Sequence, residues 1–384
     1  MISFAIKTLL SNRSKLFTGV AGVIFSLVLV NIQGGLYLGL MKKASLLVDH
    51  NEADLWVTHK LVENVDLARE IPESWQQRIR GLPTVQKAVP YLVGKGTASL
   101  NSGHMEDVWV IGSEPDSMLG SAWGFVAGSR ADLRRPYGVS FDEVDSEKLG
   151  HPQIGEWLEV NGQRTRIVAR TNGITGFITM PYLFTTYNTA RNLVHMPSGL
   201  TSFILVKIRP GKDRIALQQL IQQRIPDACV YLPEEFASIS QKYWMKRTGI
   251  GISFGAATLL GLLVGLTVVG QSLYAMAIDH LKDYATLKAI GARDSDVCSV
   301  ILTQTIWIAT VGTFLGMLVV YLIANFWNSP LAPVYIRPLL SAASVVVMFV
   351  ICIVAAFVPY LRIRKIDPVT NGTVVADVSA QYGL

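Results

Sequence analysis

A serine between two glycines is the first feature of the chain that could carry chemistry. Gly251, Ser253 and Gly255 have the spacing of the nucleophile elbow, in which a strand-to-helix turn presents a serine hydroxyl for acyl transfer. Here the motif opens a long uncharged run, so the strand that the elbow requires is missing. We therefore do not interpret Ser253 as a catalytic nucleophile.

The histidines and cysteines show no spacing typical of a metal or redox site. The six histidines are scattered, and no two of the three cysteines form a Cys-x-x-Cys pair. The sequence also lacks the G-x-x-x-x-G-K-[ST] loop that holds ATP phosphates. An Asn-x-Thr acceptor at Asn371 falls in the predicted cytoplasmic tail. We expect a non-catalytic chain that binds no cofactor or metal of its own.

The apolar residues gather in four uncharged runs. Half of the 384 residues are hydrophobic and only 16% are charged, whereas a soluble domain has about 25% charged residues. Each run is long enough to cross the roughly 30 Å hydrocarbon core of a bilayer. Ion-coupled carriers usually place ionisable groups within the membrane, so any energy for work should come from another protein. The predicted membrane helices are 16–41, 248–277, 297–325 and 339–361.

The first run is predicted to be an uncleaved signal anchor, with Lys7, Arg13 and Lys15 holding its start in the cytoplasm. Four spans then place both termini in the cytoplasm. The net charge of +6 lies mostly beside the spans, so it does not indicate nucleic-acid binding. Residues 1–15 are either an interfacial helix or a poorly ordered N-terminus. The other predicted segments are a short outer loop, 326–338, and a cytoplasmic tail, 362–384.

Residues 42–247 form the predicted extracytoplasmic domain, of α+β class. Asn161 and Gly162 are a favoured two-residue turn, which predicts a hairpin over 157–170. A helix is expected over 212–225, before Pro226. The loops 116–136 and 171–181 are rich in Gly, Ser and Pro and would join two subdomains. Further strands are predicted at 54–59, 85–100, 108–112 and 202–208.

The loop between the second and third spans, 278–296, contains a short amphipathic pattern. Its apolar residues recur every third position, which fits a helix: Leu281, Tyr284, Leu287 and Ile290. Gly291 can end that helix in the left-handed conformation, and Asp294 or Ser295 can cap the next one. Our interpretation is a cytoplasmic lever, pushed by another protein. The alternative is a helix lying on the membrane surface.

Small residues four apart occur in two of the spans and allow helices to approach closely. The pairs serve either packing within the chain or a homodimer interface, and four spans are few for a transport route, which favours a homodimer. They are Gly251 and Gly255, Gly261 and Gly265, and Gly312 and Gly316. The polar Asn31 lies deep in the first span and should face protein rather than lipid.

Residues 282–292 resemble the signature that follows the second span in ABC permeases of the MacB/FtsX type. The order of one span, a large outer domain and three spans is similar to that family's, as is the ending Arg364 to Pro368. Residues 50–57, with Ala53-Asp54-Leu55-Trp56, resemble the DevC branch from cyanobacteria most. Two positions depart from the family pattern. Asp283-Tyr284-Ala285 replaces Glu-x-Gly, and Gln304 replaces a glutamate.

The resemblance implies the permease half of an exporter in the plasma membrane of a cyanobacterium. A separate ATPase would bind ATP and Mg, and a membrane-fusion protein and an outer-membrane channel would complete a tripartite system for a glycolipid or another amphiphile. Leu281, Tyr284, Leu287 and Ile290 would enter a groove on the ATPase, with Asp283 and Lys288 forming charge pairs at its rim. The alternative is an FtsX-like signalling permease that regulates an outer-face enzyme without transporting a substrate.

Overall fold

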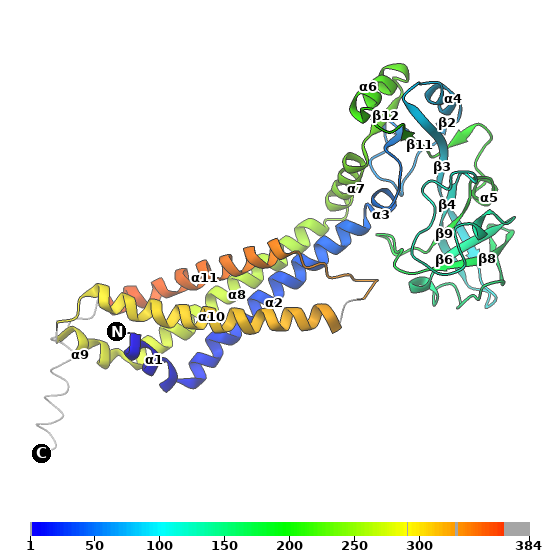
Figure 1. Ribbon diagram of the computed structural model, residues 1–384. Coiled ribbons are helices and arrows are strands. Elements are labelled where there is room, and N and C mark those ends of the chain that lie inside the picture. Colours follow the sequence, from blue (N-terminus) through cyan, green and yellow to red (C-terminus); the bar gives the residue numbers. More distant parts are fainter. Residues whose placement is uncertain (1, 290, 327–328, 365–384) are drawn as a thin grey trace, which may run out of the picture. The chain divides into compact units, whose positions relative to one another are not determined.

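The computed structural model describes residues 2–289, 291–326 and 329–364 (Figure 1). These residues divide into two compact units. A helical unit combines the described parts of 1–38, 251–328 and 333–384, and a sheet unit comprises 39–250 together with 329–332.

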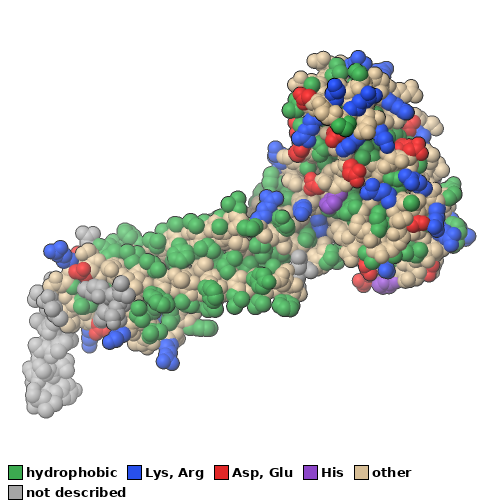
Figure 2. All heavy atoms as spheres, in the orientation of Figure 1, with side chains coloured by type: hydrophobic (Ala, Val, Ile, Leu, Met, Phe, Trp, Pro, Cys, Tyr) green, Lys and Arg blue, Asp and Glu red, His purple; other side chains and the backbone are tan. Residues whose placement is uncertain are grey.

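Long helices build the helical unit, and within the described residues four of them are long and apolar enough to cross a membrane. This confirms the four predicted spans. Figure 2 shows hydrophobic side chains along the visible sides of these helices and most of the charged ones over the sheet unit. The helices are α1 (Ile2–Ser11), α2 (Arg13–Lys43), α8 (Ile250–Asp279), α9 (Leu281–Ala289), α10 (Asp294–Phe326) and α11 (Pro338–Arg364).

One hydrophobic cluster joins the short helices to the spans. Ala5 and Leu9 of α1 and Tyr284 of α9 are buried in the same cluster as residues of α2, α8, α10 and α11. Ala5 and Leu9 of α1 therefore pack against the chain's own helices, while Leu10 on the same helix is exposed. Asn31 is fully buried and donates from Nδ2 to Ser344 Oγ of α11 at 2.8 Å, so it faces protein as predicted.

The sheet unit is built on a mixed sheet in which the described residues form ten strands, with the order β12-β1-β11-β3-β4-β9-β6-β8-β5 and β7 beside β3 and β8. The pairs β4·β9 and β6·β8 are parallel, and the other pairs in the sheet are antiparallel. The strands of this sheet are β1 (Leu55–His59), β3 (Val85–Ser99), β4 (Met105–Ser113), β5 (Phe125–Ala127), β6 (Gly138–Asp142), β7 (Trp157–Val160), β8 (Gln163–Thr171), β9 (Tyr182–Thr186), β11 (Phe203–Ile208) and β12 (Ala228–Tyr231).

Short helices and a small second pairing complete this unit. β2 (Ile71–Pro72) pairs with β10 (Leu200–Thr201). The helices are α3 (Leu46–Asp49), α4 (Ser74–Arg80), α5 (Tyr187–Leu193), α6 (Arg214–Arg224) and α7 (Pro233–Arg247). The large sheet continues through the whole unit, across the place where the loops suggested a boundary between two subdomains.

Local sequence accounts for the best-predicted elements of the sheet unit. Asn161 and Gly162 have φ of 49° and 77°, the left-handed pair that a type I′ turn between β7 and β8 requires. Asp213 caps α6 by accepting from the Ile215 amide at 2.8 Å. Trp56 is fully buried and contacts the rings of Tyr91, Phe203 and Phe236.

Candidate functional site

The short helix α9 lies between the two spans α8 and α10, and a turn of defined geometry closes it. Gly291 has a φ of +101°, and the amides of Gly291 and Ala292 bond the carbonyls of Lys288 and Leu287 at 3.0 Å each. This is the left-handed ending that the sequence predicted. These hydrogen bonds hold Gly291 and Ala292 against the end of α9.

Two acidic side chains make contacts at the turn into α10. The carboxylate of Asp296 accepts from the Arg293 amide at 2.9 Å, while Asp294 forms an ion pair with Lys288 at 2.9 Å. The Lys288 side chain is only 10% exposed. Lys288 is therefore paired within the chain, which does not fit the predicted charge pair between it and the rim of an ATPase groove.

The apolar side of α9 faces its own chain to a greater extent than the sequence suggested. Tyr284 is 1% exposed, and the half-buried Leu287 packs against the same hydrophobic cluster. Burial of Tyr284 does not fit its predicted entry into an ATPase groove. Leu281 is half-buried, and Ile290 lies outside the described residues. Among residues 281–288 of α9, the exposed positions are Lys282, Asp283 and Thr286.

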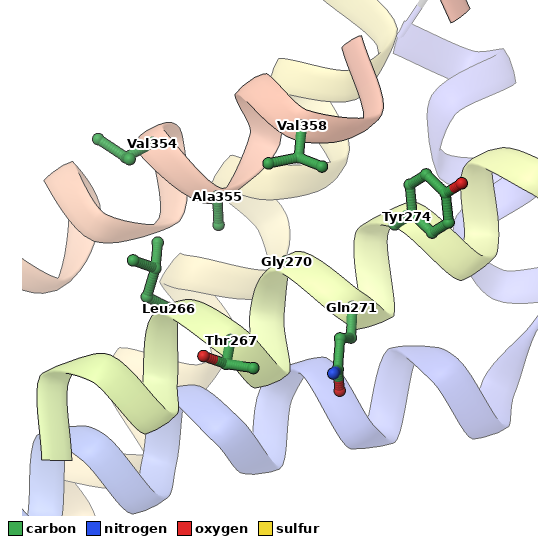
Figure 3. Close-up of a pocket in the computed structure, with 8 residues that line it drawn as sticks. All are labelled: Leu266, Thr267, Gly270, Gln271, Tyr274, Val354, Ala355 and Val358. Atoms are coloured by element: carbon green, nitrogen blue, oxygen red, sulfur yellow. The ribbon is translucent and has the colours of Figure 1, made fainter. Parts of the chain in front are cut away.

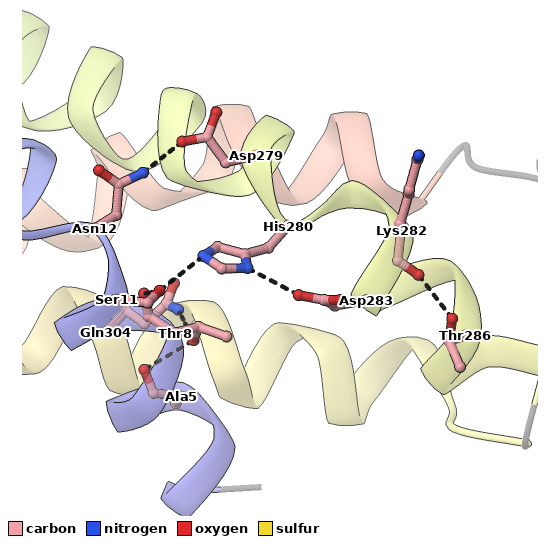
Figure 4. Close-up of polar contacts among 10 residues, drawn as sticks. All are labelled: Ala5, Thr8, Ser11, Asn12, Asp279, His280, Lys282, Asp283, Thr286 and Gln304. Atoms are coloured by element: carbon pink, nitrogen blue, oxygen red, sulfur yellow. Dashed lines mark hydrogen bonds and ion pairs between the residues drawn. The ribbon is translucent and has the colours of Figure 1, made fainter.

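A buried polar chain links α9 to α10 and α1. The Tyr284 hydroxyl hydrogen-bonds Gln304, and burial raises the pKa of Tyr284 to about 12. Gln304 donates from Nε2 to Thr8 Oγ1 at 2.8 Å, and Thr8 donates to the Ala5 carbonyl at 3.0 Å (Figure 4). Because each polar group finds a partner away from water, the chain favours one arrangement of the three helices. The sequence marked Gln304 only as a departure from a family pattern and gave no role to Thr8.

A second set of polar contacts joins the α8–α9 junction to the start of α2. His280 lies with Nδ1 2.8 Å from Asp283 Oδ2 and Nε2 3.3 Å from Ser11 Oγ (Figure 4). Asp279 accepts from both Asn12 and Lys15. Lys15 also donates to the Ala275 carbonyl at 3.0 Å. We call Tyr284, Gln304, Thr8 and these junction residues the anchors of α9.

The anchors determine what α9 can do. The helix is bonded to the spans at both of its ends and, on one side, to α1 and α10, so it cannot swing as an independent loop without breaking these contacts. A force applied to its exposed residues would therefore move α1, α8 and α10 together with it.

Four of the six predicted packing glycines lie against α2 of the same chain. A Cβ on Gly261 would lie 2.5 Å from the Leu29 side chain, and one on Gly312 would lie 2.6 Å from the Val23 side chain. Gly265 is as tight against Ser26, and Gly316 is at 2.9 Å from the Leu27 side chain. By contrast, Gly255 has open space around it, and Gly251 is half-buried in the first turn of α8. These four contacts fit packing within the chain.

Two family models cover most of the chain. Residues 17–224 match the MacB-like periplasmic core domain, and residues 255–368 match the FtsX-like permease C-terminal domain. The chain belongs to the MacB/FtsX family of ABC transporter permeases. The second match contains α9 and its turn, and the first contains the sheet unit up to α6.

Relatives include an uncharacterized ABC transporter permease of Mycobacterium tuberculosis (strain ATCC 25618 / H37Rv), 23% identical over 355 residues, which are 90% of this chain and 91% of that protein. The macrolide export ATP-binding/permease protein MacB of Agrobacterium fabrum is 25% identical over 175 residues. That match covers 44% of this chain and 26% of MacB, so this chain spans about a quarter of MacB's length.

Solved structures of isolated outer domains are also similar to part of this chain. The periplasmic region of MacB from Actinobacillus actinomycetemcomitans has a TM-score of 0.37 at 13% identity, covering 49% of this chain and 91% of that one. The extracellular domain of the transporter YknZ from Gram-positive bacteria has a TM-score of 0.34 at 13% identity, covering 46% of this chain and 98% of that one.

Proposed function

We propose that this permease is the membrane subunit of an exporter and that a separate ATPase, which carries ATP and Mg, docks on α9. The observation that supports the proposal is the anchoring of α9. Tyr284 is buried in the hydrophobic cluster of the helical unit, and Lys288 pairs with Asp294 of α10. Lys282, Asp283 and Thr286 remain exposed. The lack of a phosphate-binding loop in the sequence fits a subunit driven by another protein.

The structure leads us to revise which residues would meet the ATPase. Lys282, Asp283 and Thr286 would form the contact surface, with Leu281 at its edge and Ile290 still a candidate. Tyr284, Leu287 and Lys288 would keep α9 fixed to the helical unit. Gly291 would keep the turn into α10 tight.

Movement would then pass along the spans. Closure of the ATPase around ATP would displace α9, and the anchors would carry α1, α8 and α10 with it. The helices α2 and α8 are next to the sheet unit in the sequence, so they are the segments that would transmit the displacement to that unit.

The finer features remain proposals that rest on the resemblance. They are a membrane-fusion protein and an outer-membrane channel as partners, a glycolipid or another amphiphile as substrate, a DevC-like role, and a cyanobacterial plasma membrane with both termini in the cytoplasm. A homodimer also belongs here.

Matched substitutions on the two sides of the molecule test the docking role. Thr286→Arg adds a large charged side chain to the exposed side of α9, and Gln163→Arg adds the same group to an exposed strand of the sheet unit. We expect Thr286→Arg to abolish the stimulation of ATP hydrolysis in the reconstituted complex and Gln163→Arg to leave it unchanged. Full stimulation with Thr286→Arg would show that the ATPase docks elsewhere.

The match of residues 255–368 to an FtsX-like domain supports a second candidate, a signalling permease that activates an outer-face enzyme. Purification of the permease in mild detergent, followed by identification of its co-purifying proteins, discriminates between the exporter and the signalling permease. A co-purifying adaptor of the membrane-fusion class supports export, whereas a cell-wall hydrolase supports signalling.

A further inference from the structure

An apolar pocket of about 420 Å³ opens between α8 and α11 within the helical unit. Leu266, Gly270 and Tyr274 of α8 and Val354, Ala355 and Val358 of α11 line it (Figure 3). The volume is in the range of small-molecule sites. A Cβ added on Gly270 would lie 3.8 Å from the Ala355 Cβ, an ordinary van der Waals contact, so there is room for a side chain at this position.

The pocket lies in the part of α8 near Asp279. Gln271 is eight residues before Asp279, which corresponds to about 12 Å along a helix. The hydrocarbon half of a bilayer is about 15 Å thick, so this part of α8 lies within one leaflet. Molecules that can reach the pocket are therefore membrane lipids or apolar segments of proteins.

Polar groups at the edge of the pocket distinguish these occupants. The Gln271 side chain is exposed and lines the edge of the pocket. An amide facing hydrocarbon without a partner is costly. The Thr267 hydroxyl donates to the Leu263 carbonyl of its own helix. The polar group of Tyr274 is its hydroxyl, and this residue lies closer to the end of α8. A lipid offers an acyl chain for the pocket and ester oxygens for the amide.

We propose that the α8–α11 pocket holds one acyl chain of a bilayer lipid, with the Gln271 amide donating to an ester oxygen of that lipid. The lipid is a resident of the helical unit, so its binding requires neither the ATPase nor a transported substrate. The assignment to the cytoplasmic leaflet alone rests on the topology of the proposed function.

Filling the pocket should displace the lipid. Gly270→Leu adds a side chain where the pocket is open, so acyl-chain labelling of 266–274 and 354–358 should fall to the level of the other lipid-facing helices. Gly255→Leu is the matched control, because its side chain would enter open space elsewhere on the same helix. Gln271→Leu keeps the pocket but removes one hydrogen bond, and should weaken binding about fivefold.

The experiment uses the full chain without any ATPase, reconstituted in phosphatidylcholine vesicles that contain a phosphatidylcholine with a diazirine on one acyl chain. After irradiation, mass spectrometry should find label concentrated in 266–274 and 354–358, lost with Gly270→Leu and kept with Gly255→Leu. Label spread evenly over the lipid-facing helices, or unchanged with Gly270→Leu, would overturn the proposal. Disulfide-linked dimers of Gln271→Cys would overturn it too, by showing a second copy in the pocket.

Discussion

Replacing Tyr284 by alanine tests whether α9 is part of the packed helical unit. The ring is 1% exposed and lies in the main hydrophobic cluster. Truncating a fully buried aromatic residue costs about 3–5 kcal/mol. Losing the hydrogen bond to Gln304 adds about 1 kcal/mol. Tyr284→Phe removes only the hydroxyl, so it should cost about 1 kcal/mol.

Hydrogen exchange of residues 281–289 in mild detergent measures the free energy of opening α9 directly. With Tyr284→Ala this free energy should fall by about 4–6 kcal/mol, a rise in exchange of roughly a thousandfold or more where opening is limiting. Thr286→Ala, on the exposed side of the same helix, should change it by less than about 0.5 kcal/mol. Equal exchange in the alanine variants at 284 and 286 would refute the packing and favour a helix lying on the membrane surface.

Three further outcomes follow from the packing. Burial raises the pKa of Asp66 from 3.8 to about 6 despite its hydrogen bond from Tyr182. The Asp66 carboxyl therefore binds a proton more tightly in the folded protein than in the unfolded chain. This difference adds about 3 kcal/mol to the free energy of unfolding below pH 4, and the contribution should be lost by about pH 6. Thermal unfolding from pH 4 to 8 should show this loss. If Asp66→Asn lost as much stability over this pH range as the unaltered protein does, the assignment to Asp66 would be contradicted. Gly265→Ala, crowded by Ser26, should cost about 1–3 kcal/mol in detergent melts. Gly255→Ala should be neutral or stabilising by up to about 1 kcal/mol, and equal losses at 255 and 265 would contradict the packing.

The sequence was sufficient for features that local chemistry determines. Uncharged runs of 23 to 30 residues give the spans, because backbone polar groups in hydrocarbon must be bonded within a helix. Asn161 and Gly162 tolerate positive φ, which determines the β7–β8 turn. Gly291 ends α9 for the same reason.

The sequence did not give features that depend on distant partners. Apolar residues at every third position drift around a helix, so the spacing could not say that Tyr284 faces inward toward Gln304 and Thr8. From the sequence alone, Lys288 is expected to be an exposed charge. In the structure the turn at Gly291 brings Asp294 beside it, and the two form an ion pair.

Nonlocal pairing also hid parts of the sheet unit. Strands β6 and β9 were not predicted. β6 pairs in parallel with β8, and β9 pairs in parallel with β4, and each partner is more than twenty residues away in the sequence. The glycine pairs predicted close packing, but only the structure shows that Gly261, Gly265, Gly312 and Gly316 meet α2.

Site-specific cross-linking from α9 tests the central claim most directly. A photoreactive amino acid at position 286, on the exposed side of the anchored helix, should cross-link to an ABC ATPase in intact cells, and the same group at Gln163 should not. Cross-links from position 286 to lipid or to an outer-face protein, with no ATPase adduct, would contradict the claim that this permease is driven through α9.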